Sequence, residues 1–126
     1  MGVGVTDVGK LTVQAAAAIA ANKRVKFSGG KVVEAGLADN DVGTLDVASL
    51  AADEQVAMNL RNKPGTVFMV AAAPISLHAD VYTAAAGKIS ATAAGTSYKR
   101  GKALEAATAD GDVIAVLPVW TNTAES

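Results

Sequence analysis

The chain has 126 residues, a formal net charge of −1 and no cysteine. The absence of cysteine excludes a disulfide framework, a thiolate nucleophile and sulfur-ligated zinc, and the single histidine, His78, excludes a multi-histidine metal site within one chain. Eleven basic and twelve acidic residues leave no positive excess to attract nucleic acid or an anionic membrane. We therefore expect no metal, cofactor, nucleic-acid, membrane or small-molecule partner.

Small side chains dominate the sequence, with 28 alanines, 16 valines, 12 glycines and 10 threonines against 4% aromatic residues. At about 25 cal/mol per Å² of buried apolar surface, a core of alanine and valine is thin. This composition favours a β architecture whose protomers are completed by neighbouring copies. The start of the sequence lacks the basic residues of a secretory signal, and the alanine run at 15–21 is too short to span a bilayer. We expect a soluble protein, intracellular or part of a particle.

Residues 1–9 form an N-terminal arm ahead of the repeated part of the chain. Apolar and polar residues alternate along the arm, which suits an extended strand and not a helix. Such a strand can add to an exposed sheet edge of a partner, and the alternatives are pairing within its own protomer or fraying. The candidate docking residues of the arm are Val3, Val5, Thr6, Asp7 and Val8.

Residues 10–60 and 66–117 read as two copies of one plan. The Ala-Ala-Ala-x-Ile motif at 15–19 recurs at 71–75, an offset of 56 residues, and the Gly-Lys pair at 30–31 recurs at 87–88. Gly43 matches Gly101 at offset 58, and in the last strand Val56 matches Val113 at offset 57. Chance self-matching of an alanine-rich sequence is the alternative, but the conserved order of the landmarks favours a duplication.

The first copy predicts a hairpin with strands at 24–27 and 31–34 around Ser28-Gly29-Gly30. A third strand is expected at 43–47, a short helix at 47–54 and a fourth strand at 56–60. The alanine run at 15–21 has high helix propensity, but proline at 74 takes the place of Ala18 in the second copy. Since proline inside a helix costs about 3 kcal/mol, at most one helical turn fits both copies.

A turn at 62–65 leads into the second copy, which predicts strands at 80–83, 88–91, 101–105 and 113–117, with a turn at 85–87. Residues 119–126 are expected to form a C-terminal tail, which is polar from Thr121 to Ser126. The predicted fold is mostly β: one domain, residues 10–118, as a small sandwich or barrel built from two sequence-related β repeats, with at most short helical turns.

Ser76, His78 and Asp80 are the residue types of a hydrolase triad. At this spacing they would share one face of a strand, about 6.5–7 Å apart. A triad needs successive contacts near 3 Å, so a catalytic role is disfavoured and His78 is expected on a surface or interface. No other candidate catalytic residue emerges, and we expect a protein that is not an enzyme.

Three further patterns have structural explanations. Four Gly-Lys pairs lack the Ser or Thr that a phosphate-binding loop requires, and they suit turns with a solvated lysine. The acidic clusters at 39–41 and 110–112 lack the ligand count of a calcium loop and suit self-capped turns. Basic residues occupy the same place in each copy, and solvated strand faces are the first expectation, salt bridges to an acidic partner the second. They are Lys23, Arg24 and Lys26, then Lys99, Arg100 and Lys102.

One longer phrase carries a family resemblance. In the second copy it runs Ile75-x₄-Asp80-Val81-Tyr82, Gly87-Lys88-Ile89, Gly101-Lys-Ala-Leu-Glu-Ala106 and Gly111-Asp112-Val113-Ile114-x-Val116-Leu117. The first copy adds Ala18-Ile19-x-Ala21-Asn22-x-x-Val25-Lys26-Phe27, Ala35-Gly36 and Val42-Gly43. Over residues 10–118 the chain resembles the phage capsid decoration, or head cement, proteins, including the lambdoid type.

The resemblance implies a non-enzymatic virion protein, made in the host cytoplasm, that binds the capsid exterior and stabilises the shell. It implies the major capsid protein as partner and a homotrimer as the assembled state, with the arm residues as the capsid-binding hypothesis. The alternatives are a head-fibre base or tail-tube protein of the same particle and, less favoured, a small hydrolase using Ser76, His78 and Asp80.

Overall fold

The computed structural model describes residues 10–61 and 65–119, and this part of the chain is almost entirely β. The N-terminal arm with its five candidate docking residues lies outside the described residues, as do residues 62–64 and 120–126. The expectation of a mostly β fold with at most short helical turns is confirmed, since the one helical segment described is the three-residue 3₁₀ turn η1, Ala85–Gly87.

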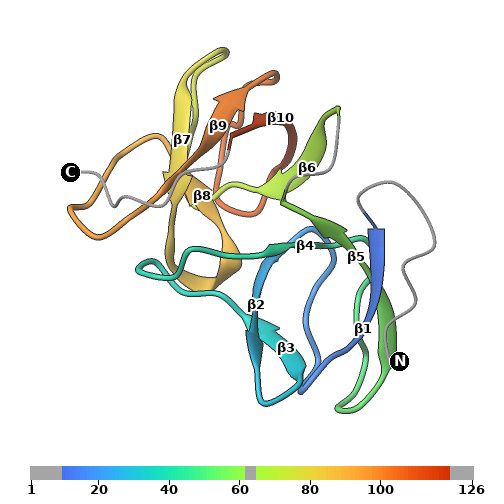
Figure 1. The fold of residues 1–126 in the computed structure, drawn as a ribbon. Helices are drawn as coiled ribbons and strands as arrows, with labels where there is room; N and C mark the ends of the chain where they lie inside the picture. Colours follow the sequence, from blue (N-terminus) through green and yellow to red (C-terminus); the bar gives the residue numbers. More distant parts are fainter. Residues whose placement is uncertain (1–9, 62–64, 120–126) are drawn as a thin grey trace.

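The strands form two five-stranded antiparallel sheets with the same order (Figure 1). The first sheet, in the order β1-β5-β4-β2-β3, is made of β1 (Lys10–Gln14), β2 (Arg24–Ser28), β3 (Lys31–Glu34), β4 (Gly43–Leu45) and β5 (Gln55–Leu60). The second sheet, in the order β6-β10-β9-β7-β8, is made of β6 (Val67–Val70), β7 (Asp80–Thr83), β8 (Ile89–Ser90), β9 (Lys99–Ala103) and β10 (Val113–Pro118). Strand for strand, β1–β5 correspond to β6–β10.

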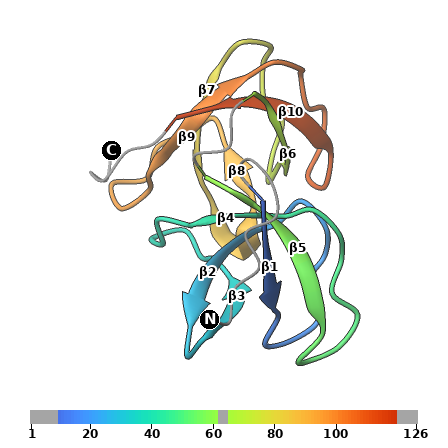
Figure 2. The same ribbon diagram turned by 45° about the vertical axis from the view of Figure 1, so that its right-hand side comes forward.

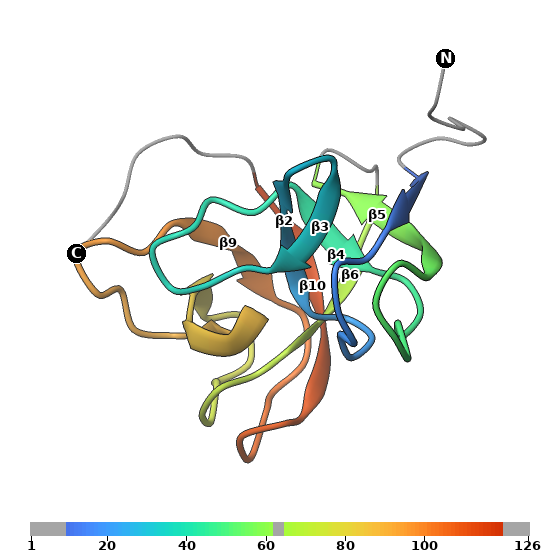
Figure 3. The ribbon, with the colours of Figure 1, turned by 90° about the horizontal axis from the view of Figure 1, so that it is seen from below.

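Each sheet curls until its two outer strands meet. A parallel bridge between Ala15 and Val32 joins the end of β1 to β3, and the bridge between Ala71 and Ile89 does the same in the second sheet. The result is a pair of small barrels that lie one against the other, as seen from two further directions in Figures 2 and 3.

Every barrel has its own apolar core. The larger buried residues of the first core are Ile19, Val25, Val32, Leu45, Val56 and Met58, and those of the second are Met69, Ile75, Val81, Ile89, Ile114 and Val116. The equivalent core positions differ in size in opposite directions. Leu45 of the first barrel corresponds to the smaller Ala103 of the second, whereas Val32 of the first corresponds to the larger Ile89. At these two positions a smaller residue in one core is thus accompanied by a larger one at the other, an exchange that packed interiors tolerate.

Neither of the two segments with helix propensity, 15–21 and 47–54, forms a helix. The alanine run after β1 contains no helix, as the proline in the second copy predicts. The predicted helix at 47–54 is wrong. Ser49 exchanges two backbone hydrogen bonds with Ile19, of 2.8 and 3.0 Å, and Asp53 has a φ of +67°. Long-range pairing with the first loop therefore outweighs the local helix propensity.

The last strand of the repeat is shifted by one residue from the predicted alignment. Val56 pairs with Val13, and the equivalent pair in the second barrel is Met69 with Ile114, so Val56 corresponds to Ile114 and not to Val113. Val56 and Ile114 are buried, whereas Val113 is 48% exposed. Both faces of β10 carry apolar residues, so alternation alone leaves this register open.

The predicted match of Gly43 with Gly101 is confirmed, and it has a steric cause. A Cβ on Gly43 would lie 2.0 Å from the carbonyl oxygen of Asn59, and one on Gly101 would lie 2.0 Å from that of Leu117. Neighbouring backbones therefore approach at these two places more closely than any side chain allows.

Candidate functional site

The two barrels meet where the β7–η1–β8 connection of the second lies against the first. The backbone N–H of Gly87 donates to the carbonyl of Ala35 over 2.8 Å, and the hydroxyl of Thr83 donates to the carbonyl of Leu37 over 2.7 Å. Gly87 has a φ of +70°, and a Cβ there would lie 3.0 Å from the Glu34 side chain. The Gly-Lys pair at 87–88 thus serves a tight inter-barrel turn.

Arg24, at the start of β2, donates hydrogen bonds from all five of its N–H groups, and two of these bonds cross to the second barrel. Its side chain is fully buried. The acceptors are the carbonyls of Lys88 at 2.9 Å, Asp39 at 3.3 Å, Gly36 at 3.0 Å and Ala84 at 2.6 Å, and the Asp41 carboxylate at 3.1 Å. Two of these carbonyls belong to the second barrel, so Arg24 fixes one barrel on the other.

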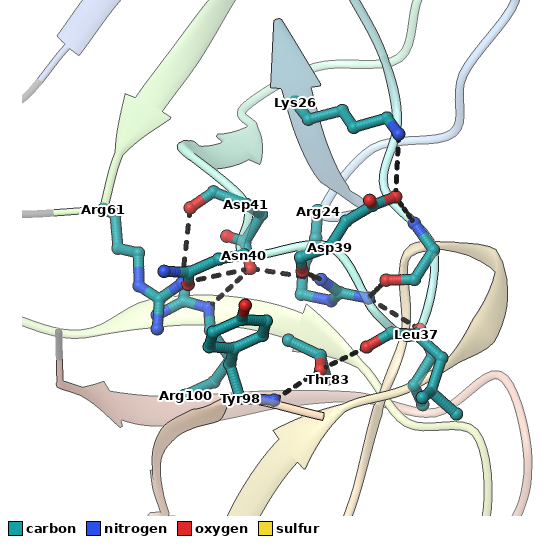
Figure 4. Close-up of polar contacts among 12 residues, drawn as sticks. Arg24, Lys26, Leu37, Asp39, Asn40, Asp41, Arg61, Thr83, Tyr98 and Arg100 are labelled. Atoms are coloured by element: carbon teal, nitrogen blue, oxygen red, sulfur yellow. Dashed lines mark hydrogen bonds and ion pairs between the residues drawn. The ribbon is translucent and has the colours of Figure 1, made fainter. Parts of the chain in front are cut away.

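Asp41 is the acidic centre of this junction. Its Oδ1 lies 3.1 Å from Arg24 Nη1, 3.1 Å from Arg100 Nε and 3.6 Å from Arg61 Nη1. Arg100 belongs to β9 of the second barrel, and Arg61 also donates to the carbonyl of Lys99, over 3.0 Å. We call Arg24, Asp41, Arg61 and Arg100 the junction cluster. Figure 4 shows the three guanidinium groups around the single carboxylate.

Burial disfavours the charged forms of the three arginines in the junction cluster. Burial lowers the pKa of Arg24 and Arg100, and it lowers that of Arg61 to about 10 with the help of the neighbouring Arg100 charge. Asp41 Oδ2 and Arg100 Nη1 are buried and make no hydrogen bond within the described part of the chain. A buried cluster of this kind depends on its one carboxylate, because removing it leaves uncompensated charges in the interior.

Sequence reasoning missed the junction cluster and misplaced its parts. The expectation that the two basic clusters occupy the same place on solvated faces is wrong for Arg24 and Arg100, which are buried. By strand register, the position equivalent to Arg24 is Asp80, because each precedes a valine that pairs with the glycine common to both copies, Gly43 or Gly101. This position therefore carries a positive charge in the first copy and a negative charge in the second. No local sequence pattern predicts this difference.

The lysines of the two basic clusters are paired inside the chain. The second cluster converges on one carboxylate, since Lys102 lies 3.0 Å and Lys99 3.5 Å from Asp80. Its hydrogen bond from Lys102 lowers the pKa of Asp80. In the first cluster, Lys26 pairs with Asp39 over 3.0 Å, and Lys23 pairs with Glu34 over 3.2 Å.

The structure does not assemble the triad residues. The prediction that they share a strand face is wrong: Ser76 and His78 lie in an exposed turn closed by a 3.1 Å hydrogen bond from Ala79 N to Ser76 O, and only Asp80 lies in β7. His78 has a φ of +66°, as does Asn22 at the same place in the first barrel. The turn is thus a feature of both repeats, and Asp80 turns to lysines instead of His78.

One aspartate of each acidic cluster caps its own loop, as predicted, but the prediction is wrong for Asp41, which is buried in the junction cluster, and Asp110 pairs with Lys88. Asp39 accepts the N–H of Gly36 over 2.7 Å, and Asp112 accepts those of Thr108 and Ala109 over 2.8 and 3.2 Å. These bonds lower the pKa of both carboxyl groups. Within residues 10–61 and 65–119, no three acidic or histidine side chains gather as metal ligands. No helix in the same part is long and apolar enough to cross a membrane.

Comparison with known proteins gives a likeness of fold. No protein-family model matches the chain, and no curated protein matches its sequence. The chain is similar in fold to the crystal structure of the N base of head fibre gp8.5 of bacteriophage phi29, with a TM-score of 0.71 and 17% sequence identity. The match covers 87% of this chain and 92% of that chain, so it spans both barrels. The two proteins share the two-barrel fold.

Proposed function

We propose that this chain is a structural protein of a phage virion that binds the outer surface of the assembled head. The observation that carries the proposal is the fold shared, over nearly the whole of both chains, with the N base of a phage head fibre. The resemblance of the sequence to head decoration proteins points to the same location from independent features.

The junction cluster supports a mechanical role. A protein that stabilises a shell transmits load between its contacts, and two barrels joined by a flexible linker would transmit little. Here Arg24 and Arg61 donate to backbone carbonyls of the second barrel, and Asp41 contacts Arg100 across the junction. The two barrels therefore present their outer surfaces in a fixed relation.

Within this function, two roles are open to the chain. A decoration protein caps and reinforces the shell, whereas a head-fibre base anchors a longer appendage. We propose decoration, and the fold likeness to the phi29 base supports the head-fibre base as the alternative. Decoration genes lie beside the protease and major capsid genes, so the position of this chain's gene distinguishes the roles.

The proposed partner is the major capsid protein, and the proposed assembled state is a homotrimer. Small alanine- and valine-rich cores gain from burial against neighbours, and closed cyclic symmetry is the common solution. We propose the arm residues Val3, Val5, Thr6, Asp7 and Val8 as a strand that adds to a sheet edge of the capsid protein.

Co-sedimentation with empty expanded capsids tests the proposal. The capsids are assembled from the major capsid protein encoded beside this chain's gene, and the purified chain is mixed with them and pelleted. We expect saturable binding, unchanged by Ser76→Ala, which removes the candidate nucleophile of the hydrolase alternative. A chain that stays in the supernatant at every concentration contradicts capsid binding.

A further inference from the structure

The outward faces of the two barrels differ sharply at equivalent positions. In the second barrel, one outward row consists of Phe68 in β6, Ala115 in β10 and Leu104 directly after β9, since Phe68 pairs with Ala115 and the N–H of Leu104 bonds the Ala115 carbonyl. Val113 and Leu117 flank Ala115 on the same face of β10. We call these five residues the apolar face. Phe68 is 57% exposed and Leu117 48%.

The first barrel provides an internal control for this face. The equivalent positions hold Thr12, Ala57, Asp46, Gln55 and Asn59. Asp46 there forms a 3.2 Å ion pair with Lys10 and accepts a 3.3 Å hydrogen bond from Asn59. The two barrels share a backbone arrangement, but four of these five positions are polar in the first barrel and all five are apolar in the second.

We propose that the apolar face is the surface through which copies of this chain pack against one another. The inference deepens the proposed homotrimer by naming its contact surface. The face carries no charge, so bringing it against a copy creates no like-charge repulsion. The flanking charges are engaged within the chain: Lys102 pairs with Asp80 over 3.0 Å, and Glu105 accepts the N–H of Ala115 over 2.8 Å.

The size of the apolar face fits the centre of such a contact. From the exposed fractions of its side chains, the face offers about 350 Å² per copy, which is typical of the largest and often functional patch on a small protein. A stable interface needs about 800 Å² per partner, with an apolar centre and a polar rim. The apolar face supplies a little under half of this area, and its polar surroundings would supply the rim.

Light scattering and sedimentation velocity of the full chain, over roughly a hundredfold range of concentration, provide the test. The variant Phe68→Thr/Leu117→Asn installs the two residues found at the equivalent positions of the first barrel. We expect the natural chain to associate and the variant to dissociate with a dissociation constant raised at least about thirtyfold. Because both side chains point outward, the thermal midpoint should stay within a few degrees when it is measured at a concentration at which both proteins are monomeric.

Leu50→Thr is the matched control. Leu50 is 80% exposed and lies outside the apolar face, and its equivalent in the second barrel is Thr108. This variant should associate like the natural chain. If the double variant is less stable than expected, Leu117→Asn alone is measured in its place.

Two results overturn the inference: the natural chain is monomeric over the whole range of concentration, or the double variant associates as the natural chain does. If in the second case the double variant also loses capsid binding, the apolar face contacts the capsid protein instead. Capsid binding by the natural chain is measured separately. A chain that self-associates through the apolar face but does not bind capsids contradicts the proposed function alone, and a chain that binds capsids without self-association contradicts this inference alone.

Discussion

Replacing Asp41 by asparagine keeps the volume of the side chain and removes the one negative charge of the junction cluster. Three guanidinium groups lie within 3.1 to 3.6 Å of its Oδ1, and all four side chains are at most 1% exposed. Breaking a buried ion pair by removing one partner costs about 3–5 kcal/mol. At roughly 3–4 °C per kcal/mol for a domain of this size, the thermal midpoint should fall by about 10–20 °C.

Two control variants make the Asp41 experiment specific. Asp46→Asn removes an ion pair with Lys10 whose side chains are 39% exposed, so it should cost at most about 1 kcal/mol. Lys99→Gln changes the position equivalent to Asp41 in the second barrel, where the pair with Asp80 is solvated, and it should cost as little. Unfolding followed by circular dichroism measures all three variants. If Asp41→Asn costs no more than Asp46→Asn, the junction cluster does not hold the barrels together.

Three further predictions concern backbone packing, acid stability and the arm. Gly43→Ala and Gly101→Ala should each cost more than about 3 kcal/mol by denaturant unfolding, since a Cβ would clash with a carbonyl oxygen, whereas Gly29→Ala, with open space around it, should cost about 1 kcal/mol; equal costs would refute the close approach. The lowered pKa values of Asp39, Asp80 and Asp112 mean that the unfolded chain binds more protons in acid, so the contribution of these groups to stability should be fully present above about pH 5 and be lost as the pH falls through the folded pKa values. Asp112→Asn should make the thermal midpoint fall less steeply with decreasing pH, because it removes one of these carboxyl groups. An unchanged pH dependence would contradict the contribution of Asp112 to acid stability. Deleting residues 1–8 should leave the thermal midpoint within a few degrees and weaken capsid binding at least tenfold, about 1.4 kcal/mol; normal binding would show that the arm is not the anchor, and failure to fold would make it a core strand.

The repeated plan could be predicted because its landmarks are local. Glycines that permit a close backbone approach, such as Gly43 and Gly101, and the β2–β3 hairpin turn at Gly29 and Gly30 are determined by sterics at single positions. β1 and β6 were missed because each is a short strand whose pairing partner, β5 or β10, lies more than 40 residues away.

The junction cluster could not be predicted because burial of a charge is decided by tertiary packing. Arg24 and Lys26 alternate along one strand like any solvated pair, and it is the 36–41 loop and the second barrel together that enclose Arg24. Asp41 sits in an acidic loop whose other aspartate, Asp39, caps its own turn as the sequence suggests. The one-residue shift of β10 has a similar origin, since Val113 and Ile114 are equally apolar and only contact with the core distinguishes them.

A cryo-electron microscopy map of the particle that carries this chain tests the central claim most directly. The proposed function predicts density for the two-barrel fold on the exterior of the head, at three-fold and pseudo-three-fold positions, with each copy contacting the major capsid protein. Density for the fold inside the shell, in the tail or in no part of the particle would contradict the assignment of this chain to the outer surface of a phage head.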